Sequence, residues 1–255
     1  MSFSGKVVLV TGASSGIGAA TAVLFSGSGA RVALVGRNEA KLSNVAEKCA
    51  ARSAHPLVIK ADVANEEEAK TIVQKTVDHF GQLDILVNNA GIARYASVSE
   101  PNILEIFDIV MKTNLRSVVQ LTNLAAPHLA ATKGNIVNVS SIAAHTVLQN
   151  SAPYCVSKVG LDHFTRCAAL ELASSGVRVN SVNPGPVRTD ILEASGLVTA
   201  DQSDETWDKM KVMTALNNVS EPSEIADVIA FLASDKARSI TGSIYVSDNG
   251  FLLKK

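Results

Sequence analysis

The chain has 255 residues, of which 47% are hydrophobic and 18% charged, a composition that suits a folded soluble protein and excludes intrinsic disorder. Its net charge is −1 and its basic residues are scattered, so we expect no nucleic-acid partner. A chain of this length can bury a sizeable core within one large α/β domain.

Seven short apolar runs, rich in β-branched residues, are predicted to form β-strands. They are apolar throughout rather than at alternate positions, which is typical of parallel strands buried on both faces. In chain order the runs are 6–10, 31–35, 56–59, 83–87, 135–139, 177–182 and 243–246.

Helices are predicted between these strands. Asn65 is a typical N-cap and three glutamates follow it, while Pro153 and Pro222 suit a first helical turn. The predicted helices are 19–25, 38–52, 65–80, two within 100–131, 153–173 and 221–233. The alternation of strands and helices predicts one doubly wound α/β domain of the Rossmann type, with a parallel seven-stranded sheet, over 1–255.

Targeting and metal-binding signals are missing from the sequence. The first residues do not form a signal peptide, no apolar run approaches the roughly 20 residues of a membrane span, and the last four residues match no lipidation or peroxisomal signal. Cys49, Cys155 and Cys167 show no metal-ligand spacing and suit a reducing compartment. We therefore expect a cytoplasmic protein with no metal and no membrane partner.

A glycine-rich turn follows the first predicted strand and opens the next helix. Gly12, Gly16 and Gly18 have the spacing Gly-x-x-x-Gly-x-Gly rather than the commoner Gly-x-Gly-x-x-Gly. Glycines in this position let backbone amides approach a pyrophosphate at the helix N-terminus. The turn therefore predicts nucleotide binding.

Tyr154 and Lys158 are four residues apart and share one face of a predicted helix. A cation close to a phenol favours the phenolate, so we expect a lowered pKa for Tyr154 and a role in proton transfer. Pairs with this spacing are common by chance, so the interpretation depends on the rest of the chain.

Six motifs, in order and at matching spacing, resemble those of the classical short-chain dehydrogenase/reductase family. They are Thr11-Gly12-x-x-x-Gly16-x-Gly18, Asn88-Asn89-Ala90-Gly91, Asn114, Ser141, Tyr154-x-x-x-Lys158 and Asn183-Pro184-Gly185. The resemblance covers 6–250 and implies the strand order 3-2-1-4-5-6-7. It also implies an oxidoreductase that interconverts a carbonyl and a secondary alcohol by hydride transfer.

The same resemblance assigns four catalytic residues. Tyr154 would exchange a proton with the substrate oxygen, and Lys158 would lower its pKa and bind the nicotinamide ribose. Ser141, 13 residues before Tyr154, is favoured over its neighbour Ser140 for holding the substrate oxygen. Asn114 would position a water of a proton relay through its carbonyl, and an Asn inside a helix also suggests a kink.

Cofactor-binding residues also follow from the resemblance. The glycine turn would bind the pyrophosphate, 62–63 the adenine, and 184–189 the nicotinamide, while 88–91 would support the sheet as much as the cofactor. For Asp62 a helix-capping role is an alternative. The full set is Gly12, Ser14, Ser15, Gly16, Ile17, Gly18, Arg37, Asp62, Val63, Asn88, Ala90, Gly91, Tyr154, Lys158, Pro184, Gly185, Val187 and Thr189.

The end of the second strand indicates which cofactor is bound. An acidic residue there would bind the ribose 2′-hydroxyl of NAD, whereas Arg accommodates a 2′-phosphate. The sequence has Gly36 and Arg37 and no carboxylate, which predicts NADP(H). The basic residue that some NADP-dependent relatives have within the glycine turn is replaced here by Ser14 and Ser15.

Three alternative functions remain open. One is an NAD-dependent alcohol or hydroxysteroid dehydrogenase. A second is a 3-oxoacyl-carrier-protein reductase, although Thr132 and Ser175 stand where such enzymes commonly carry arginines. The third is a cofactor-binding scaffold without catalysis, which the complete set of Ser141, Tyr154 and Lys158 argues against.

The stretch of about 190–218 lacks periodicity and resembles the family's variable substrate lid. Its apolar residues could line a substrate site, with core packing and a subunit contact as alternatives: Leu192, Leu197, Trp207, Met210, Met213 and Leu216. Relatives often form tetramers through two long helices, here about 100–131 and 153–173, so we expect a homotetramer or homodimer. The tail 251–255 could pack at such an interface.

Overall fold

A parallel β-sheet forms the centre of the computed structural model, which describes residues 1–52, 55–199 and 202–254. Its strands are β1 (Val7–Thr11), β2 (Arg31–Gly36), β3 (Leu57–Lys60), β4 (Ile85–Asn88), β5 (Asn135–Val139), β6 (Arg178–Pro184) and β7 (Ile244–Ser247). The seven strands lie in the order β3-β2-β1-β4-β5-β6-β7, and every neighbouring pair is parallel. The fold class and the strand order predicted from the sequence are confirmed.

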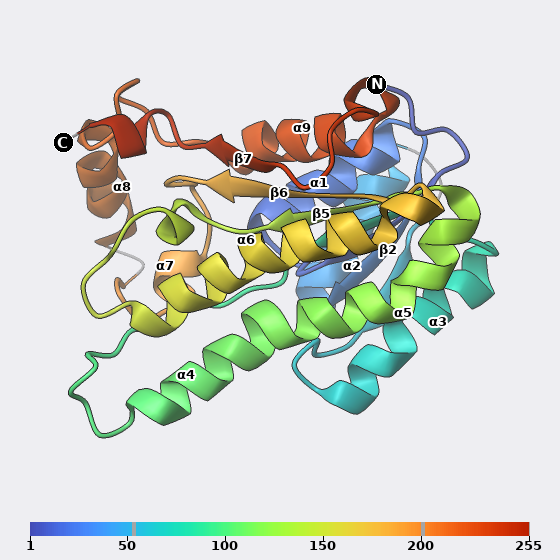
Figure 1. The fold of residues 1–255 in the computed structure, drawn as a ribbon. Helices are drawn as coiled ribbons and strands as arrows, with labels where there is room; N and C mark the ends of the chain where they lie inside the picture. The colour runs from blue at the N-terminus through green and yellow to red at the C-terminus, as the bar shows by residue number, and fades with distance from the viewer. Residues whose placement is uncertain (53–54, 200–201, 255) are drawn as a thin grey trace.

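Helices cover both faces of the sheet (Figure 1). The longer ones are α1 (Gly16–Gly27), α2 (Glu39–Ala50), α3 (Glu66–Phe80), α4 (Ile103–Met111), α5 (Ser117–Thr132), α6 (Ala152–Leu172), α8 (Ser203–Val212) and α9 (Pro222–Ala233), and α7 (Ile191–Ala194) is a single turn. Helices α1, α2 and α9 pack on one face, and α3, α5 and α6 on the other.

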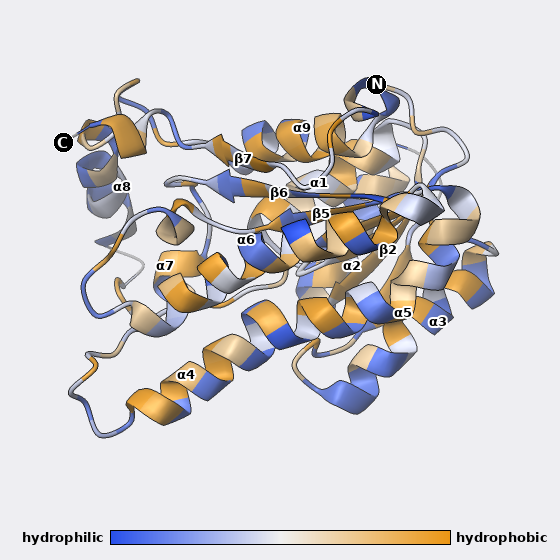
Figure 2. Cartoon of the chain, in the orientation of Figure 1, coloured by the Kyte–Doolittle hydropathy of each residue, from blue (hydrophilic) through white to orange (hydrophobic). Residues whose placement is uncertain are grey.

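The core lies in two layers because successive residues of a strand point to opposite faces. Along β1, Val8 and Val10 pack toward α1 and α9, whereas Val7 and Leu9 pack toward α3 and α5. All four are fully buried. Figure 2 shows the consequence: the central strands are mostly apolar, whereas helices such as α3 carry both apolar and polar residues.

The structure differs from the sequence-based elements at two places that affect the site. Helix α1 begins at Gly16, inside the glycine turn, because glycine tolerates the left-handed φ of +54° there. The stretch 190–218 contains α7 and α8, which are too short for a clear apolar period. Part of that stretch, 200–201, lies outside the described residues, as do 53–54 and 255 of the predicted domain and tail.

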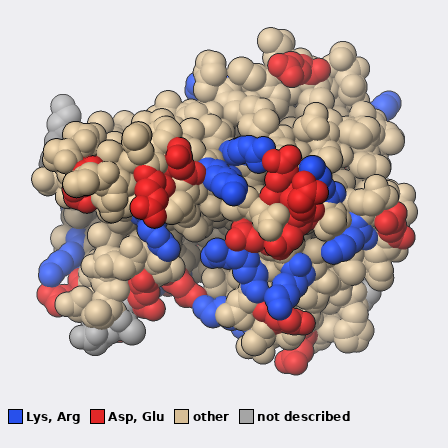
Figure 3. Space-filling view, turned by 90° about the horizontal axis from the view of Figure 1, so that it is seen from below, with Lys and Arg blue, Asp and Glu red and all other residues tan. Residues whose placement is uncertain are grey.

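Among the described residues, no helix has the length and apolar character needed to cross a bilayer. Within the same part of the chain, no group of three or more His, Cys, Asp or Glu side chains is arranged to hold a metal ion. On the face shown in Figure 3, acidic and basic side chains lie next to one another. The lack of a nucleic-acid partner stays a prediction.

Candidate active site

A cavity of about 570 Å³ opens at the carboxyl ends of the strands. These ends are where open α/β sheets bind ligands. Most of the predicted site residues line this cavity: Gly12, Ser14, Ser15, Gly16, Ile17, Arg37, Asp62, Val63, Ala90, Gly91, Ser141, Tyr154, Lys158, Pro184, Gly185, Val187 and Thr189. Gly18, Asn88 and Asn114 do not line it.

The glycine turn is shaped by close contacts between backbones. A Cβ on Gly12, whose φ is +64°, would lie 2.8 Å from Cα of Ala90. A Cβ on Gly16 would lie 3.0 Å from Cγ2 of Thr189. A Cβ on Gly18 would collide with the carbonyl oxygen of Gly12, so Gly18 shapes the turn without facing the cavity.

Asn89 holds the glycine turn against the sheet. Its Nδ2 donates to the carbonyl oxygens of Thr11 at 2.9 Å and Gly12 at 3.2 Å. The Thr11 hydroxyl in turn accepts hydrogen bonds from the backbone N–H groups of Asn89 and Ala90. Sequence reasoning did not assign this role to Asn89, although its place within the 88–91 motif was a signal that could have found it.

Asn88 supports the sheet rather than the cavity. Its Nδ2 donates to Oδ1 of Asn138 on the neighbouring strand β5 at 2.9 Å, and both residues are buried. This position explains why Asn88 does not reach a ligand: its side chain joins β4 to β5 below the cavity floor.

The N-terminus of α1 suits the pyrophosphate of a dinucleotide. Ser15 is the N-cap residue, its side chain makes no capping hydrogen bond, and the first turn carries no acidic residue. The first N–H groups of a helix have no partner within it, and the helix dipole favours an anion there. Together with the two glycines at positive φ, this donor set fits a bound nucleotide.

Arg37 and Asp62 lie together where the cavity passes the ends of β2 and β3. The Arg37 side chain is 70% exposed, and its Nη1 lies 3.6 Å from Oδ2 of Asp62. Asp62 accepts a hydrogen bond from the backbone N–H of Ala64, whereas Asn65 caps α3. Asp62 therefore closes a turn and is not the cap of α3, which was the alternative role expected for it. Its carboxylate also faces Arg37.

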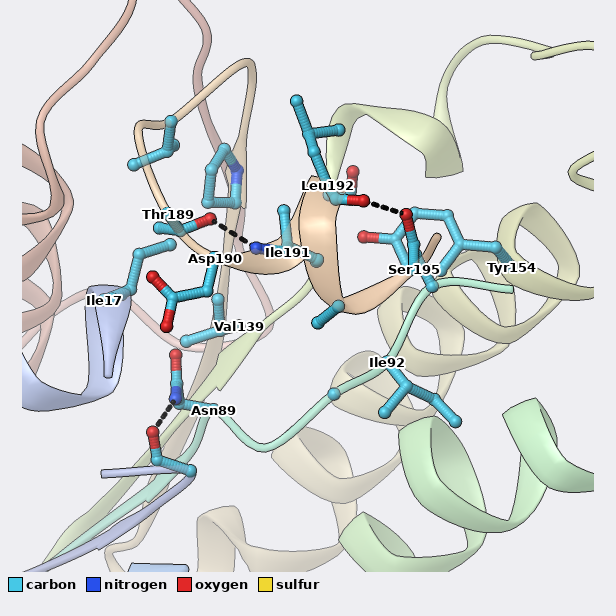
Figure 4. Close-up of a pocket in the computed structure, with 18 of the residues that line it drawn as sticks. Ile17, Asn89, Ile92, Val139, Tyr154, Thr189, Asp190, Ile191, Leu192 and Ser195 are labelled. Atoms are coloured by element: carbon cyan, nitrogen blue, oxygen red, sulfur yellow. Dashed lines mark hydrogen bonds between the residues drawn. The ribbon is translucent and has the colours of Figure 1, made fainter. Parts of the chain in front are cut away.

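Tyr154 and Lys158 project from α6, with Ser141 opposite them just after β5. Nζ of Lys158 lies 5.6 Å from the centre of the Tyr154 ring and donates to the carbonyl oxygen of Val139 at 3.0 Å. The Ser141 hydroxyl accepts a hydrogen bond from the backbone N–H of Ala143. Figure 4 shows Tyr154 across the cavity from Asn89, with 189–192 passing between them.

Burial dominates the electrostatics of this pair. It raises the pKa of Tyr154 to about 12, although a hydrogen bond with Ser141 acts in the opposite direction. It also lowers the pKa of Lys158 to about 8, against the attraction of Asp162. The direction for Tyr154 is opposite to our expectation, because burial removes solvent from the phenol and this effect is larger than that of the hydrogen bond with Ser141.

Asn114 lies in a π-helical turn, Lys112–Arg116, between α4 and α5. Its Oδ1 accepts from the backbone N–H of Ile92 and its Nδ2 donates to the carbonyl of the same residue, both at 2.9 Å. The side chain is thus fully engaged in holding the loop after β4. A kink at this Asn was expected from the sequence, and π-turns recur at functional sites.

The other end of the cavity is apolar and is built largely from the stretch 190–218. Leu192, Trp207, Met210 and Met213 line it, whereas Leu197 and Leu216 are 49% and 72% exposed and lie elsewhere. Tyr95, Leu148 and Phe251 complete this end, and no motif in the sequence identified them.

Two cationic side chains hold α7 over the cavity. Lys41 of α2 pairs with Asp190, just before α7, at 2.8 Å. Arg94 donates to the carbonyl oxygen of Ala194, the last residue of α7, at 2.7 Å. Both contacts join segments that are far apart in the sequence.

Comparison with known proteins gives a consistent result. A family model described as "Enoyl-(Acyl carrier protein) reductase" matches residues 12–252. The chain is 35% identical to cyclohexanol dehydrogenase of Acinetobacter sp. over 99% of this chain and 97% of that protein. It is 36% identical to a 3-oxoacyl-(acyl-carrier-protein) reductase of Staphylococcus aureus, covering 97% of this chain and 98% of that one.

A solved structure is also similar along almost its whole length. It is a short-chain dehydrogenase/reductase of unknown function from Caenorhabditis elegans, crystallised with cofactor, with 36% sequence identity and a TM-score of 0.94. The alignment covers 99% of this chain and 97% of that chain.

Proposed function

The chain belongs to the short-chain dehydrogenase/reductase family, and from that premise we propose that it is an NADP(H)-dependent oxidoreductase interconverting a carbonyl and a secondary alcohol. The observation that supports this most strongly is that Ser141, Tyr154 and Lys158 line the same cavity as the glycine turn. A hydride donor held by that turn would therefore face a proton donor on α6.

Each residue has a distinct task in this proposal. The nicotinamide cofactor, when bound, supplies or accepts the hydride. In the reducing direction Tyr154 donates its proton to the substrate oxygen, and the Ser141 hydroxyl holds that oxygen in place. The raised pKa of Tyr154 keeps it protonated at neutral pH, as an acid must be. The charge of Lys158 offsets the phenolate that forms.

Asn114 has a supporting task. Because both polar atoms of its amide bond the backbone of Ile92, it fixes the loop that passes beside Lys158. Its own backbone carbonyl, in the π-turn, remains the candidate for the water of a proton relay. This division of tasks extends the role expected from the sequence.

NADP(H) rather than NAD(H) is proposed from the end of β2. Gly36 offers no carboxylate for a 2′-hydroxyl, and the exposed Arg37 can reach a 2′-phosphate. The contact between Arg37 and Asp62 favours the alternative, an NAD-dependent alcohol or hydroxysteroid dehydrogenase, because it must open before Arg37 can bind a phosphate with both nitrogens.

The substrate is proposed to be an uncharged, largely apolar ketone or alcohol. Trp207, Met210, Met213 and Leu148 line the end of the cavity beyond Tyr154, and the nearby Arg94 is engaged with backbone carbonyls. An acyl-carrier substrate is less well supported, since Thr132 binds the carbonyl of Leu83 and neither Thr132 nor Ser175 offers a cation.

A substrate screen tests this function. The purified protein is mixed with NADPH or NADH and a panel of alicyclic, aromatic, sugar and β-ketoacyl thioester carbonyls, and loss of reduced cofactor is followed by absorbance. We expect the fastest oxidation with NADPH and apolar ketones. Equal use of NADH would refute the assignment to Arg37, and no turnover on any carbonyl would support a non-catalytic scaffold.

Assembly and location belong to the same proposal. Helices α5 and α6 carry exposed apolar side chains, among them Val119, Val156, Val159 and Leu170, and these suit the interface of a homotetramer or homodimer. Sedimentation of the purified protein measures the state. Three free cysteines suit a reducing compartment such as the cytoplasm.

A further inference from the structure

Asp162 is a buried carboxylate close to the catalytic residues, and the proposed mechanism gives it no task. It lies on α6 one turn beyond Lys158 and is only 5% exposed. Its Oδ2 accepts a hydrogen bond from Nδ2 of Asn183 at 2.7 Å, and its Oδ1 accepts one from the Ser181 hydroxyl at 3.2 Å. Burying a carboxyl group is costly unless it is hydrogen-bonded, and here both oxygens accept hydrogen bonds from β6.

One connection runs from Asp162 to Ser141. Nδ2 of Asn183, which donates to Asp162, also donates to the backbone carbonyl oxygen of Ser141 at 3.1 Å. Asn183 is fully buried on β6, so its amide has a fixed orientation. The carboxylate therefore orients the amide that holds the serine end of the site.

A second connection runs from Asp162 to Lys158. Lys158 is 4% exposed, and among the described residues its ammonium binds only the neutral carbonyl of Val139. The negative charge of Asp162 is the influence that raises the pKa of Lys158 against the effect of burial. A single carboxylate is thus coupled to both sides of the catalytic constellation.

Several other groups lie around Lys158 and Asp162. His145, after the turn Ile142–Ala144, has its Nε2 3.7 Å from Oδ2 of Asp162 and 3.1 Å from Nδ2 of Asn183. Strand β5 contributes only the carbonyl of Val139, β6 contributes Ser181 and Asn183, and the π-turn contributes Asn114, none of which titrates. Among the described residues, the titratable groups beside this pair are Tyr154, which faces Lys158, and His145, which faces Asp162. Cys155 and, from the loop after β4, Tyr95 act on Tyr154.

We propose that Asp162 is a positioning residue of this site, which places a carboxylate one helical turn from Lys158 and fixes Ser141 through Asn183. The inference rests on the proposed function. It adds a residue that contacts neither substrate nor cofactor but acts on two residues that do.

The test compares pH profiles of kcat/KM for carbonyl reduction, measured with the best substrate of the screen. Asp162→Asn keeps the size of the side chain and removes its charge. We expect the pH at which kcat/KM falls on the basic side of the profile to be about one unit or more lower than in the wild type, because Lys158 then loses its proton more readily. We also expect kcat to fall about tenfold or more.

Two control variants isolate the charge. Ser181→Ala removes a hydrogen bond to Asp162 and keeps the carboxylate, and His145→Gln removes the imidazole that lies beside it. In both variants we expect kcat/KM to fall at the same basic pH as in the wild type. If that pH shifted as far in His145→Gln as in Asp162→Asn, the proposal would be overturned, since histidine would then be the titrating group.

The remaining outcomes are also decisive. An unmoved basic limb in a folded Asp162→Asn protein would overturn the proposal, even if kcat were reduced. If that variant does not fold, Asp162→Ser repeats the test, and failure of both to fold would assign Asp162 a purely structural role. Wild-type protein without any turnover would instead refute the proposed function, so the two failures are distinguishable.

Discussion

The two ends of the cavity are built in different ways. At the nucleotide end, a fully buried strand leads into a turn whose contacts are between backbones: Gly12 against Ala90, and Gly18 against Gly12. At the substrate end, a single helical turn, α7, is held by the Lys41–Asp190 pair and the Arg94 contact, and the lining combines side chains of 190–218 with those of Tyr95, Leu148 and Phe251.

This difference reflects what each end has to recognise. A pyrophosphate has one shape, and a fixed set of amides at a helix N-terminus suits it whatever the substrate. Substrates differ, and a lining of exchangeable apolar side chains on short helices can be altered without disturbing the sheet. The predictions below test each end in turn.

The largest effect is expected from Gly18→Ala at the nucleotide end. The new Cβ would collide with the Gly12 carbonyl, so we expect a loss of about 3 kcal/mol or more in the free energy of unfolding, with loss of NADPH binding. Gly27→Ala, in the same helix, is the control, because its Cβ would meet only the Arg52 side chain at 3.3 Å. Chemical denaturation measures both, and equal stability of the two variants would contradict the account.

The same contrast explains what could be predicted from the sequence. The glycine turn and the positions of Ser141, Tyr154 and Lys158 could be predicted because their motifs have a fixed spacing along the chain, and the strand order followed from the family that those motifs resemble. The place of Asn89 within the 88–91 motif pointed to a supporting role, but Asp162 could not be identified, since its hydrogen bonds run to a distant strand. Nor could Tyr95, Leu148 and Phe251, which the fold brings together from three unrelated loops. The pKa direction of Tyr154 also needed the degree of burial, which spacing does not give.

Lys158→Met is expected to lower the activity and to raise the stability of the protein. We expect kcat to fall about 10²- to 10³-fold, because nothing then offsets the developing phenolate. Because the pKa of Lys158 is lowered to about 8 in the folded protein, its charge opposes folding, so the variant should unfold at a higher temperature. The gain in the free energy of unfolding is complete below pH 8 and disappears as the pH rises toward the ordinary pKa of lysine. A variant that is less stable than the wild type at pH 7 would refute this prediction.

The wild-type pH profile follows from the same group. In the proposed mechanism, reduction needs both a protonated Tyr154 and a charged Lys158, whose pKa values are about 12 and about 8. We therefore expect kcat/KM to be constant near neutrality and to fall above pH 8. A profile that rises through pH 8 in the reducing direction would contradict this assignment.

Arg37→Ala should change cofactor selection with little effect on the fold. We expect KM for NADPH to rise about 10- to 100-fold, since a charge-assisted contact to phosphate is lost, with KM for NADH almost unchanged. Lys60→Ala is the matched control, because Lys60 is an exposed cation nearby that pairs with Glu39. An equal rise in KM for NADPH and NADH would show that Arg37 does not bind the 2′-phosphate.

The smallest effect is expected at the substrate end, from Asp190→Asn. The Lys41–Asp190 pair is half exposed, and pairs of this kind contribute about 0.2–1 kcal/mol. We expect cofactor release, measured by stopped-flow fluorescence, to become up to about fivefold faster, and added salt to have the same effect on the wild type. Glu205→Gln, which breaks an exposed pair on α8, should leave release unchanged.

Tyr154→Phe tests the central claim most directly. The variant removes one hydroxyl from a residue whose ring keeps its place on α6, and NADPH binding and carbonyl reduction are measured on the same sample. We expect binding within about twofold of the wild type and turnover reduced at least about a thousandfold. Turnover near the wild-type rate would contradict the role of Tyr154 as the proton donor.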